Sequence, residues 1–376
     1  MRKTIVHIIT STDTGGAENM LSNLIEGASS RTAHRAVISL LPLGAIAEKI
    51  NAFGVETLSL NMKSGADALL YLSRLARMLR VLKPDLVHTW MYHANLLGSL
   101  AAFLAGRPPV VWGLHHNNLA FSANKKSTLM VAGLCAPISH FPLVKKIISC
   151  SQEALATHRK LGYCSPKMQV IPNGFDLNRF KPDPSARQEL RICLGLAPDT
   201  PIACMVGRWD PQKDPENFIK AVAKAHRESP RSIYLMCGKG FDNKNSQLKS
   251  MLRNAGISKK VLLLGKRDDI PFIMAGIDLL VLPSRGEAFP MVMGEAMACG
   301  TPCVATDVGD AAYLNGNLGW IIPPRNHEAL AKAMVKGLSL GKDQREILGM
   351  KLRYRVRMNF SLADTVKKYE ALYARI

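Results

Sequence analysis

Two acidic residues, Glu287 and Glu295, flank the junction between a predicted strand and a predicted helix. The apolar run 277–282 predicts a buried parallel strand, and 291–299 predicts a helix closed by a glycine. The loop between them therefore lies at the carboxyl end of a strand, where open α/β sheets bind ligands. The helix N-terminus offers free N–H groups and a positive dipole end to an anion such as a diphosphate. Two carboxylates there could hold hydroxyl groups of the same ligand or act as an acid–base pair.

Two cations follow another predicted strand, at 201–206. Gly207 lets the chain turn where this strand ends, and Arg208 and Lys213 lie in the loop that follows. An arginine fork and a lysine point charge together suit a diphosphate leaving group. Either residue alone would more simply be a surface cation. Their position directly after a buried strand favours anion binding.

These segments resemble the glycosyltransferases of family 4, which are retaining enzymes with the GT-B fold. Glu287-Ala-Phe-Pro followed by Glu295-Ala-Met-Ala-Cys-Gly-Thr-Pro is similar to the E-x7-E signature of that family, and Gly207-Arg208-x4-Lys213 is similar to its G-R-x4-K element. The resemblance implies that Glu287 contacts the transferred sugar and Glu295 the ribose of a nucleotide. It also implies that Arg208 and Lys213 neutralise the diphosphate as the sugar departs.

Further residues enter the predicted site through the same resemblance. His116 is the preferred histidine near the sugar, as a base or a hydrogen-bond donor, and the adjacent His115 is the alternative. His93 and His115 are weaker candidates for the acceptor side. The remaining donor-side residues lie in the Gly-Gly loop after the first strand, in the predicted nucleobase loop and around the first glutamate: Gly15, Gly16, Lys266, Arg267, Phe289, Pro290 and Met291.

The order of predicted elements defines the expected fold. Strands and helices alternate through both halves of the chain, which predicts two doubly wound, Rossmann-like parallel sheets, the GT-B arrangement in which two domains face across a cleft. A Pro-, Asp- and Arg-rich segment near residue 180 is the expected linker. The predicted domains are 1–180 for the acceptor and 181–358 for the nucleotide sugar. The helix predicted at 359–376 would cross back to the first domain, as in GT-B proteins.

Composition excludes several classes of protein. With 376 residues and 47% hydrophobic content, the chain fits two ordinary globular domains. No apolar run approaches the roughly 18 residues of a membrane-spanning helix, and the run at 5–9 is too short for a signal peptide. Eight cysteines without a C-x-x-C pair fit a reducing cytosol. We therefore expect a cytoplasmic protein.

The net charge of +20 calls for a partner or another reason, and an anionic partner is one candidate. Arg74, Arg77, Arg80 and Lys83 recur every three residues through a predicted helix at 69–82, which is typical of a basic amphipathic helix on an anionic membrane surface. From this segment alone, an ordinary surface helix with a solvated basic face is the simpler interpretation. A second basic cluster, at residues 351–357, is equally ambiguous. No nucleic-acid-binding motif is present, so no nucleic acid is expected.

No Asp-x-Asp motif and no zinc-ligand spacing occur in the chain. The resemblance thus implies a metal-independent hexosyltransferase without a cofactor, with cations in the metal's electrostatic role. We expect it to transfer sugar from a nucleotide diphosphate sugar to a saccharide or lipid-linked saccharide in the synthesis of cell-surface polysaccharides such as lipopolysaccharide, at the inner membrane face. The alternatives are a sugar-nucleotide epimerase and a non-catalytic basic binding protein. The loop from Asp307 to Asp310 departs from the Gly-Gly-Glu pattern of many family members.

Overall fold

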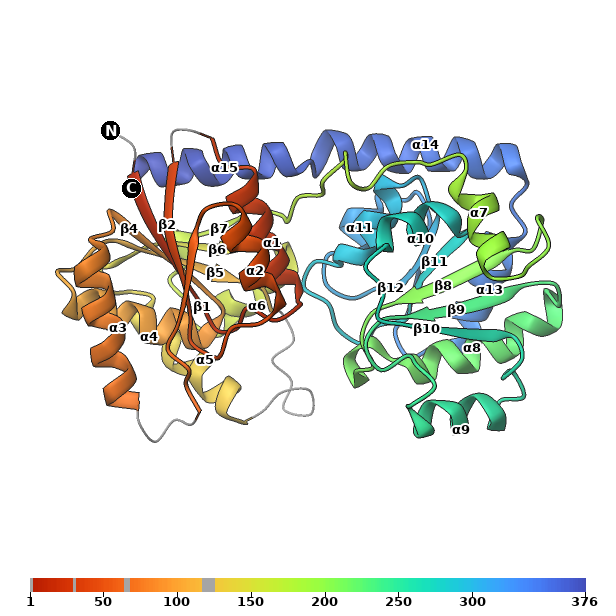
Figure 1. Ribbon diagram of the computed structural model, residues 1–376, viewed down its shortest axis with the longest axis horizontal. Helices are drawn as coiled ribbons and strands as arrows, with labels where there is room; N and C mark the ends of the chain where they lie inside the picture. Colours follow the sequence, from red (N-terminus) through yellow and green to blue (C-terminus); the bar gives the residue numbers. More distant parts are fainter. Residues whose placement is uncertain (1–2, 30–31, 64–67, 117–125) are drawn as a thin grey trace. The chain divides into compact units, whose positions relative to one another are not determined.

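The computed structural model describes residues 3–29, 32–63, 68–116 and 126–376 (Figure 1). The chain divides into two compact units, each built on a parallel sheet. The first unit contains residues 1–174 and 362–376, and the second contains residues 175–361. The predicted fold class of two doubly wound sheets is confirmed. The chain leaves the first unit after Gly174, six residues before the predicted boundary near 180.

The first unit alternates strands and helices, as the sequence predicts. Its strands are β1 (Lys3–Ile9), β2 (Thr32–Ser39), β3 (Glu56–Ser59), β4 (Leu86–Trp90), β5 (Val110–Leu114), β6 (Val144–Ser149) and β7 (Met168–Val170). Its helices are α1 (Gly16–Glu26), α2 (Ala45–Ala52), α3 (Ala68–Leu82), α4 (Tyr92–Leu104), α5 (Lys126–Ile138), α6 (Gln152–Lys160), the short η1 (Ser165–Lys167) and α15 (Leu362–Arg375).

The seven strands of this sheet lie in the order β3-β2-β1-β4-β5-β6-β7. The order reverses between β1 and β4, which is the point where doubly wound sheets open a crevice at their carboxyl ends. Helices α1, α2 and α15 cover one face of the sheet, and α3, α4 and α5 cover the other (Figure 1). Both faces are apolar, as expected for a sheet buried between two helical layers.

The second unit has the same design. Its strands are β8 (Ile202–Val206), β9 (Ile233–Cys237), β10 (Val261–Gly265), β11 (Leu279–Leu282), β12 (Cys303–Thr306) and β13 (Trp320–Ile322). Its helices are α7 (Ala186–Cys193), η2 (Pro211–Lys213), α8 (Pro215–Glu228), α9 (Ser246–Asn254), α10 (Ile270–Gly276), α11 (Met291–Ala298), α12 (Ala311–Asn315), α13 (His327–Leu338) and α14 (Lys342–Asn359). The strand order is β10-β9-β8-β11-β12-β13, so the reversal lies between β8 and β11.

The last two helices belong to different units. Helix α14 packs on α11 in the second unit, whereas α15 buries Tyr369 and Tyr373 in the core of the first. The sequence predicts a helix over 359–376, and in the structure α15 begins at Leu362. Gly174 is required where α15 starts, because a Cβ there would lie 2.6 Å from Leu362 Cα. Two residues, Phe360 and Ser361, thus separate two helices that belong to different units.

Candidate active site

The loop after β11 brings Glu287 against Lys213. Lys213 Nζ donates to Glu287 Oε1 at 2.6 Å, and the buried Ser284 Oγ donates to the same oxygen at 2.7 Å. The lysine and glutamate side chains are only 22% and 10% exposed. Because β8 and β11 are neighbours at the reversal of strand order, the loops that follow them meet at one edge of the sheet. This contact is consistent with the prediction that Lys213 and Glu287 belong to the same site.

Local backbone geometry positions Lys213 in its loop. Asp210 caps the short helix η2 by accepting from Gln212 N at 2.8 Å. The next residue after the lysine, Asp214, has φ 49° and ψ 55°, a left-handed conformation that is uncommon outside glycine. Its side chain then caps α8, which begins at Pro215. Lys213 is therefore held between two capped helices rather than in a loose loop.

Arg285 links the loop of Lys213 to the loop of Glu287, and sequence reasoning missed it. Its backbone N–H donates to Gln212 O at 2.7 Å, and its Nη2 donates to Asp214 Oδ1 at 2.7 Å. The Asp214 carboxylate is buried, whereas the Arg285 side chain is 35% exposed. In the sequence Arg285 is one more cation in a loop. Only the contact with a residue 71 positions earlier identifies it as part of the site.

Arg208 lies on the same loop but has a different partner. Its Nε donates to Asp210 Oδ2 at 2.9 Å, and its side chain is 57% exposed. Gly207 precedes it at the end of β8, and a Cβ on this glycine would be 3.6 Å from Lys213 Cγ. The structure thus places the two predicted cations in one loop. Lys213 forms an ion pair with Glu287, and Arg208 forms one with Asp210.

Glu295 lies on α11, one turn beyond the helix start. Pro290 is the N-cap residue, Met291 opens the helix, and Phe289 is buried against Phe175 with ring centroids 6.0 Å apart. Glu295 is half-buried, and burial raises its pKa from 4.5 to about 7, with the positive charge of Arg179 acting in the opposite direction. A partly buried carboxylate with a raised pKa is a candidate for a functional site.

The raised pKa of Glu295 predicts a specific pH dependence of stability. The folded chain binds this proton more tightly than the unfolded chain does, so stability falls as pH rises from about 4.5 to about 7. The full shift corresponds to roughly 3 kcal/mol, and partial exposure reduces this to about 1–2 kcal/mol. Glu295→Gln should remove the decline in urea unfolding free energy between pH 5 and pH 8. An unchanged pH slope in this variant would contradict the assignment.

The loop from Asp307 to Asp310 packs directly on the Glu287 loop. Gly309 has φ +56°, and a Cβ there would lie 2.2 Å from Glu287 O. Asp310 N donates to Ala288 O at 3.1 Å. Although this loop differs from the family pattern, it has a glycine, Gly309, where its backbone meets that of the Glu287 loop.

The predicted nucleobase loop follows β10. Lys266 and Arg267 are both exposed, and Arg267 makes a two-point contact with Asp269, with Nε–Oδ1 at 2.8 Å and Nη2–Oδ2 at 2.5 Å. The pKa of Asp269 is held below its usual range by this hydrogen bond. A role of Lys266 and Arg267 at the nucleobase stays a prediction from the family resemblance.

The predicted residues of the first unit lie at the carboxyl edge of its sheet. Gly15 is the N-cap of α1 and Gly16 its first residue, directly after the β1 loop. His93 is in the first turn of α4, and burial lowers its pKa. These segments follow β1 and β4, the two strands between which the order reverses.

The two adjacent histidines after β5 differ in their surroundings. The ring of His115 stacks on Trp90 at 5.0 Å, and burial lowers its pKa to about 4. In the described part of the chain, neither of its ring nitrogens has a hydrogen-bond partner. His116 is half-buried and meets the edge of Tyr92, with centroids 6.2 Å apart. Asn117, which follows them in the motif, lies outside the described residues.

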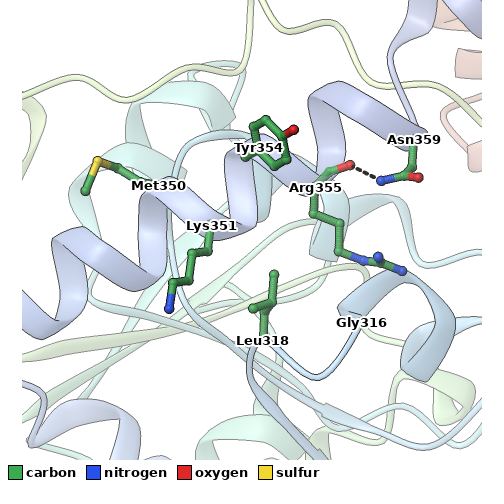
Figure 2. A pocket seen from close by; sticks show the side chains of 7 residues that line it. All are labelled: Gly316, Leu318, Met350, Lys351, Tyr354, Arg355 and Asn359. Carbon is green, nitrogen blue, oxygen red and sulfur yellow. Dashed lines mark hydrogen bonds between the residues drawn. The ribbon is translucent and has the colours of Figure 1, made fainter.

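The second basic cluster of the sequence has largely structural roles. Arg353 donates to the carbonyls of Leu177, Phe180 and Ala298, and so ties α14 to the start of the unit. Arg355 donates to the carbonyls of Tyr313 and Leu314. Arg355 also lines a hollow of about 560 Å³. Figure 2 shows the residues around this hollow, which are Gly316, Leu318, Met350, Lys351, Tyr354, Arg355 and Asn359. None of the predicted site residues lines this hollow.

The described residues lack two kinds of feature. Within residues 3–29, 32–63, 68–116 and 126–376, no group of three or more His, Cys, Asp or Glu is placed to hold a metal ion. In the same ranges no helix is both long and apolar enough to cross a membrane.

Comparisons with known proteins define the class and then the family. The structure superposes on the crystal structure of Anabaena Alr3699/HepE in complex with UDP and glucose with a TM-score of 0.87, at 24% identity and over 100% of both chains. Two doubly wound units with this likeness define a GT-B glycosyltransferase fold. Residues 14–179 match the model of Glycosyltransferase Family 4, and residues 186–351 match that of Glycosyl transferases group 1.

Two relatives complete the comparison. The UDP-Gal:alpha-D-GlcNAc-diphosphoundecaprenol alpha-1,3-galactosyltransferase of Escherichia coli is 30% identical over 332 residues, which are 87% of this chain and 84% of the relative. The D-inositol 3-phosphate glycosyltransferase of Nocardia farcinica is 29% identical over 286 residues, which are 71% of this chain and 61% of the relative. The chain belongs to glycosyltransferase family 4.

Proposed function

We propose that this glycosyltransferase moves a sugar from a nucleotide diphosphate sugar to a saccharide or lipid-linked saccharide, with retained anomeric configuration and without a metal ion. The observation that carries the proposal is the contact of Lys213 with Glu287 at the strand-order reversal of the second unit. A cation beside a carboxylate suits the point where the sugar of the donor joins its diphosphate. The lysine can neutralise the diphosphate, and the carboxylate can accept hydrogen bonds from the sugar hydroxyls.

The proposed roles follow from the chemistry of each group. Lys213 and Arg208 would neutralise the diphosphate as the bond from the sugar to its oxygen breaks. Glu287 would accept hydrogen bonds from sugar hydroxyls, and Glu295 from the ribose. No enzyme nucleophile is assigned. A diphosphate oxygen on the same face of the sugar would take the acceptor proton, so the new bond forms where the old one broke.

Support for a lipid-linked acceptor comes from one relative and from charge. The Escherichia coli relative is named for a diphosphoundecaprenol acceptor. The net charge of +20 and the exposed basic side chains of α3 suit a location on the anionic inner face of the cytoplasmic membrane.

A panel of nucleotide sugars tests this function directly. Release of nucleotide diphosphate is measured with each donor, with and without membrane lipid extract, and the anomeric configuration of the product is read by NMR. We expect release that depends on the extract and a product with retained configuration. A converted donor without acceptor would indicate an epimerase. No release with any donor and extract would contradict the transferase reaction.

Arg285 is a positioning residue in this scheme. Arg285→Ala removes one of the contacts between the two loops and leaves the buried carboxylate of Asp214 without its cation. We expect kcat to fall about 10-fold, since misplacing a charged group by a fraction of an ångström weakens transition-state stabilisation. KM for the donor should change less than 3-fold, and Arg285→Lys should restore part of kcat. Equal loss in both variants would instead indicate a purely structural role.

A further inference from the structure

The helices α3, α4 and α5 form one layer of the first unit, and the outer side of this layer carries exposed apolar side chains. α4 packs on both neighbours, so the three helices lie side by side (Figure 1). We define the α4–α5 face by Leu100, Phe103 and Leu104 of α4, Met130 and Leu134 of α5, and Phe141 after α5. These side chains are between 40% and 63% exposed. Exposed apolar side chains gathered on two helices that pack together are the kind of surface that interaction sites use.

The sequence segment that contains these three helices has almost no acidic residues. Residues 68–151 contain nine cations, Arg74, Arg77, Arg80, Lys83, Arg107, Lys125, Lys126, Lys145 and Lys146, and a single acidic residue, Asp85. That aspartate is engaged by Thr4 N at 2.8 Å. The exposed side of α3 alternates apolar and basic residues at helical spacing, from Leu70 through Arg74 and Arg77 to Val81. Apolar and cationic groups thus share one surface.

The basic and apolar groups meet where α3 and α4 end. Arg80 Nη2 donates to Leu104 O at 2.8 Å, and the Arg107 guanidinium lies 4.5 Å from the centre of the Phe103 ring. Beside them is a hollow of about 290 Å³, lined by Leu79, Arg80, Lys83, Pro84, Ala105, Gly106 and Pro108. Two cations at an apolar rim suit a phosphate head group whose acyl chains lie on the apolar side chains.

We propose that the α4–α5 face, with the basic side of α3, is the surface by which this chain binds an anionic phospholipid bilayer. The apolar side chains would enter the head-group region, and the arginines and lysines would contact lipid phosphates. A second copy of the chain is a poor occupant, because this surface is basic and both copies carry +20. The proposal deepens the proposed function by assigning its membrane contact to named residues.

Vesicle co-sedimentation tests the surface without any donor or acceptor, so its failure is distinct from failure of the transferase reaction. Vesicles of phosphatidylglycerol and phosphatidylcholine are compared with vesicles of phosphatidylcholine alone. We expect binding to the anionic vesicles only, and at least a 10-fold weaker apparent affinity for Phe103→Ser/Leu104→Ser. The matched control is Ile347→Ser/Met350→Ser, which removes equally exposed apolar side chains from α14 in the second unit. It should bind as the unsubstituted chain does.

Tryptophan fluorescence quenching by brominated lipid measures how deeply a side chain enters the bilayer. It distinguishes loss of membrane contact from misfolding of a serine variant. Phe103→Trp keeps a large apolar side chain and should be quenched by brominated phosphatidylglycerol in the bilayer. Met350→Trp is its counterpart on α14 and should not be quenched. Quenching of both, equal loss of binding in both serine variants, or absence of binding to anionic vesicles would overturn the proposal. If the chain bound an acidic soluble protein but no vesicles, the proposal would also be overturned.

Discussion

Lys213→Ala is expected to lower kcat for sugar transfer by about 10²–10³ while the chain stays folded. Lys213 is the partly buried cation whose Nζ lies 2.6 Å from Glu287, and its stem is held between the caps of η2 and α8. Removing it takes away positive charge at the point where the diphosphate would leave. We expect Arg208 alone not to compensate for the loss, because its side chain is exposed and paired with Asp210.

Lys220→Ala is the matched control for this experiment. Lys220 lies on α8 and pairs with Glu216 at 2.7 Å, but both side chains are at least half exposed. Its loss should leave kcat within 2-fold. The double variant Lys213→Ala/Glu287→Gln should lose less than the product of the two single effects, since the partners touch. If Lys213→Ala kept more than a third of the activity, the leaving-group role of this lysine would be contradicted.

The pairing of distant loops explains both the success and the limits of the sequence prediction. Apolar runs and glycine turns mark β8 and β11 in the sequence, so the positions of Lys213 and Glu287 after strands are predictable. The adjacency of these strands, which are separated by β9 and β10 in the chain, is a property of the sheet order. The family resemblance supplied that link, because periodicity cannot distinguish which parallel strands are neighbours.

Residues whose role depends on one tertiary contact could not be predicted. Arg285 and Arg208 are both arginines in loops, yet Arg285 bridges two loops whereas the exposed Arg208 pairs with Asp210 in its own loop. The basic residues at 351–357 appeared to form a surface cluster, but Arg353 and Arg355 hold carbonyls of distant segments. Long arginine side chains reach partners that local spacing does not reveal.

Helix α14 was absent from the prediction for a related reason. Its exposed apolar residues Ile347, Met350, Tyr354 and Met358 recur on one side, while Leu352 and Val356 are buried on the other. Two apolar stripes blur the single-sided pattern by which an amphipathic helix is recognised. The end of the chain was predicted as one helix over 359–376, whereas the structure ends α14 at Asn359 and begins α15 at Leu362.

Asp278→Asn is expected to lower the free energy of unfolding of the second unit by about 3–5 kcal/mol. The Asp278 side chain is fully buried just before β11, and three arginines surround it: Arg191 at 2.5 Å, Arg345 at 2.9 Å and Arg187 at 3.0 Å. Its Oδ2 also accepts from Ile202 N, the first residue of β8, at 2.8 Å. Removing the negative charge leaves the fully buried Arg191 uncompensated.

Asp199→Asn is the control for Asp278→Asn, because Asp199 pairs with Arg231 at a site where both side chains are about 70% exposed. Urea unfolding should show no measurable change for the exposed pair and a large loss for the buried one. Asp278 lies at the opposite end of β11 from the loop of Glu287. The fraction of Asp278→Asn that remains folded should therefore keep its kcat, since this carboxylate fixes β8 against β11 without contacting the ligand loops. A reduced kcat in that folded fraction would show instead that strand register is coupled to the placement of Lys213 and Glu287.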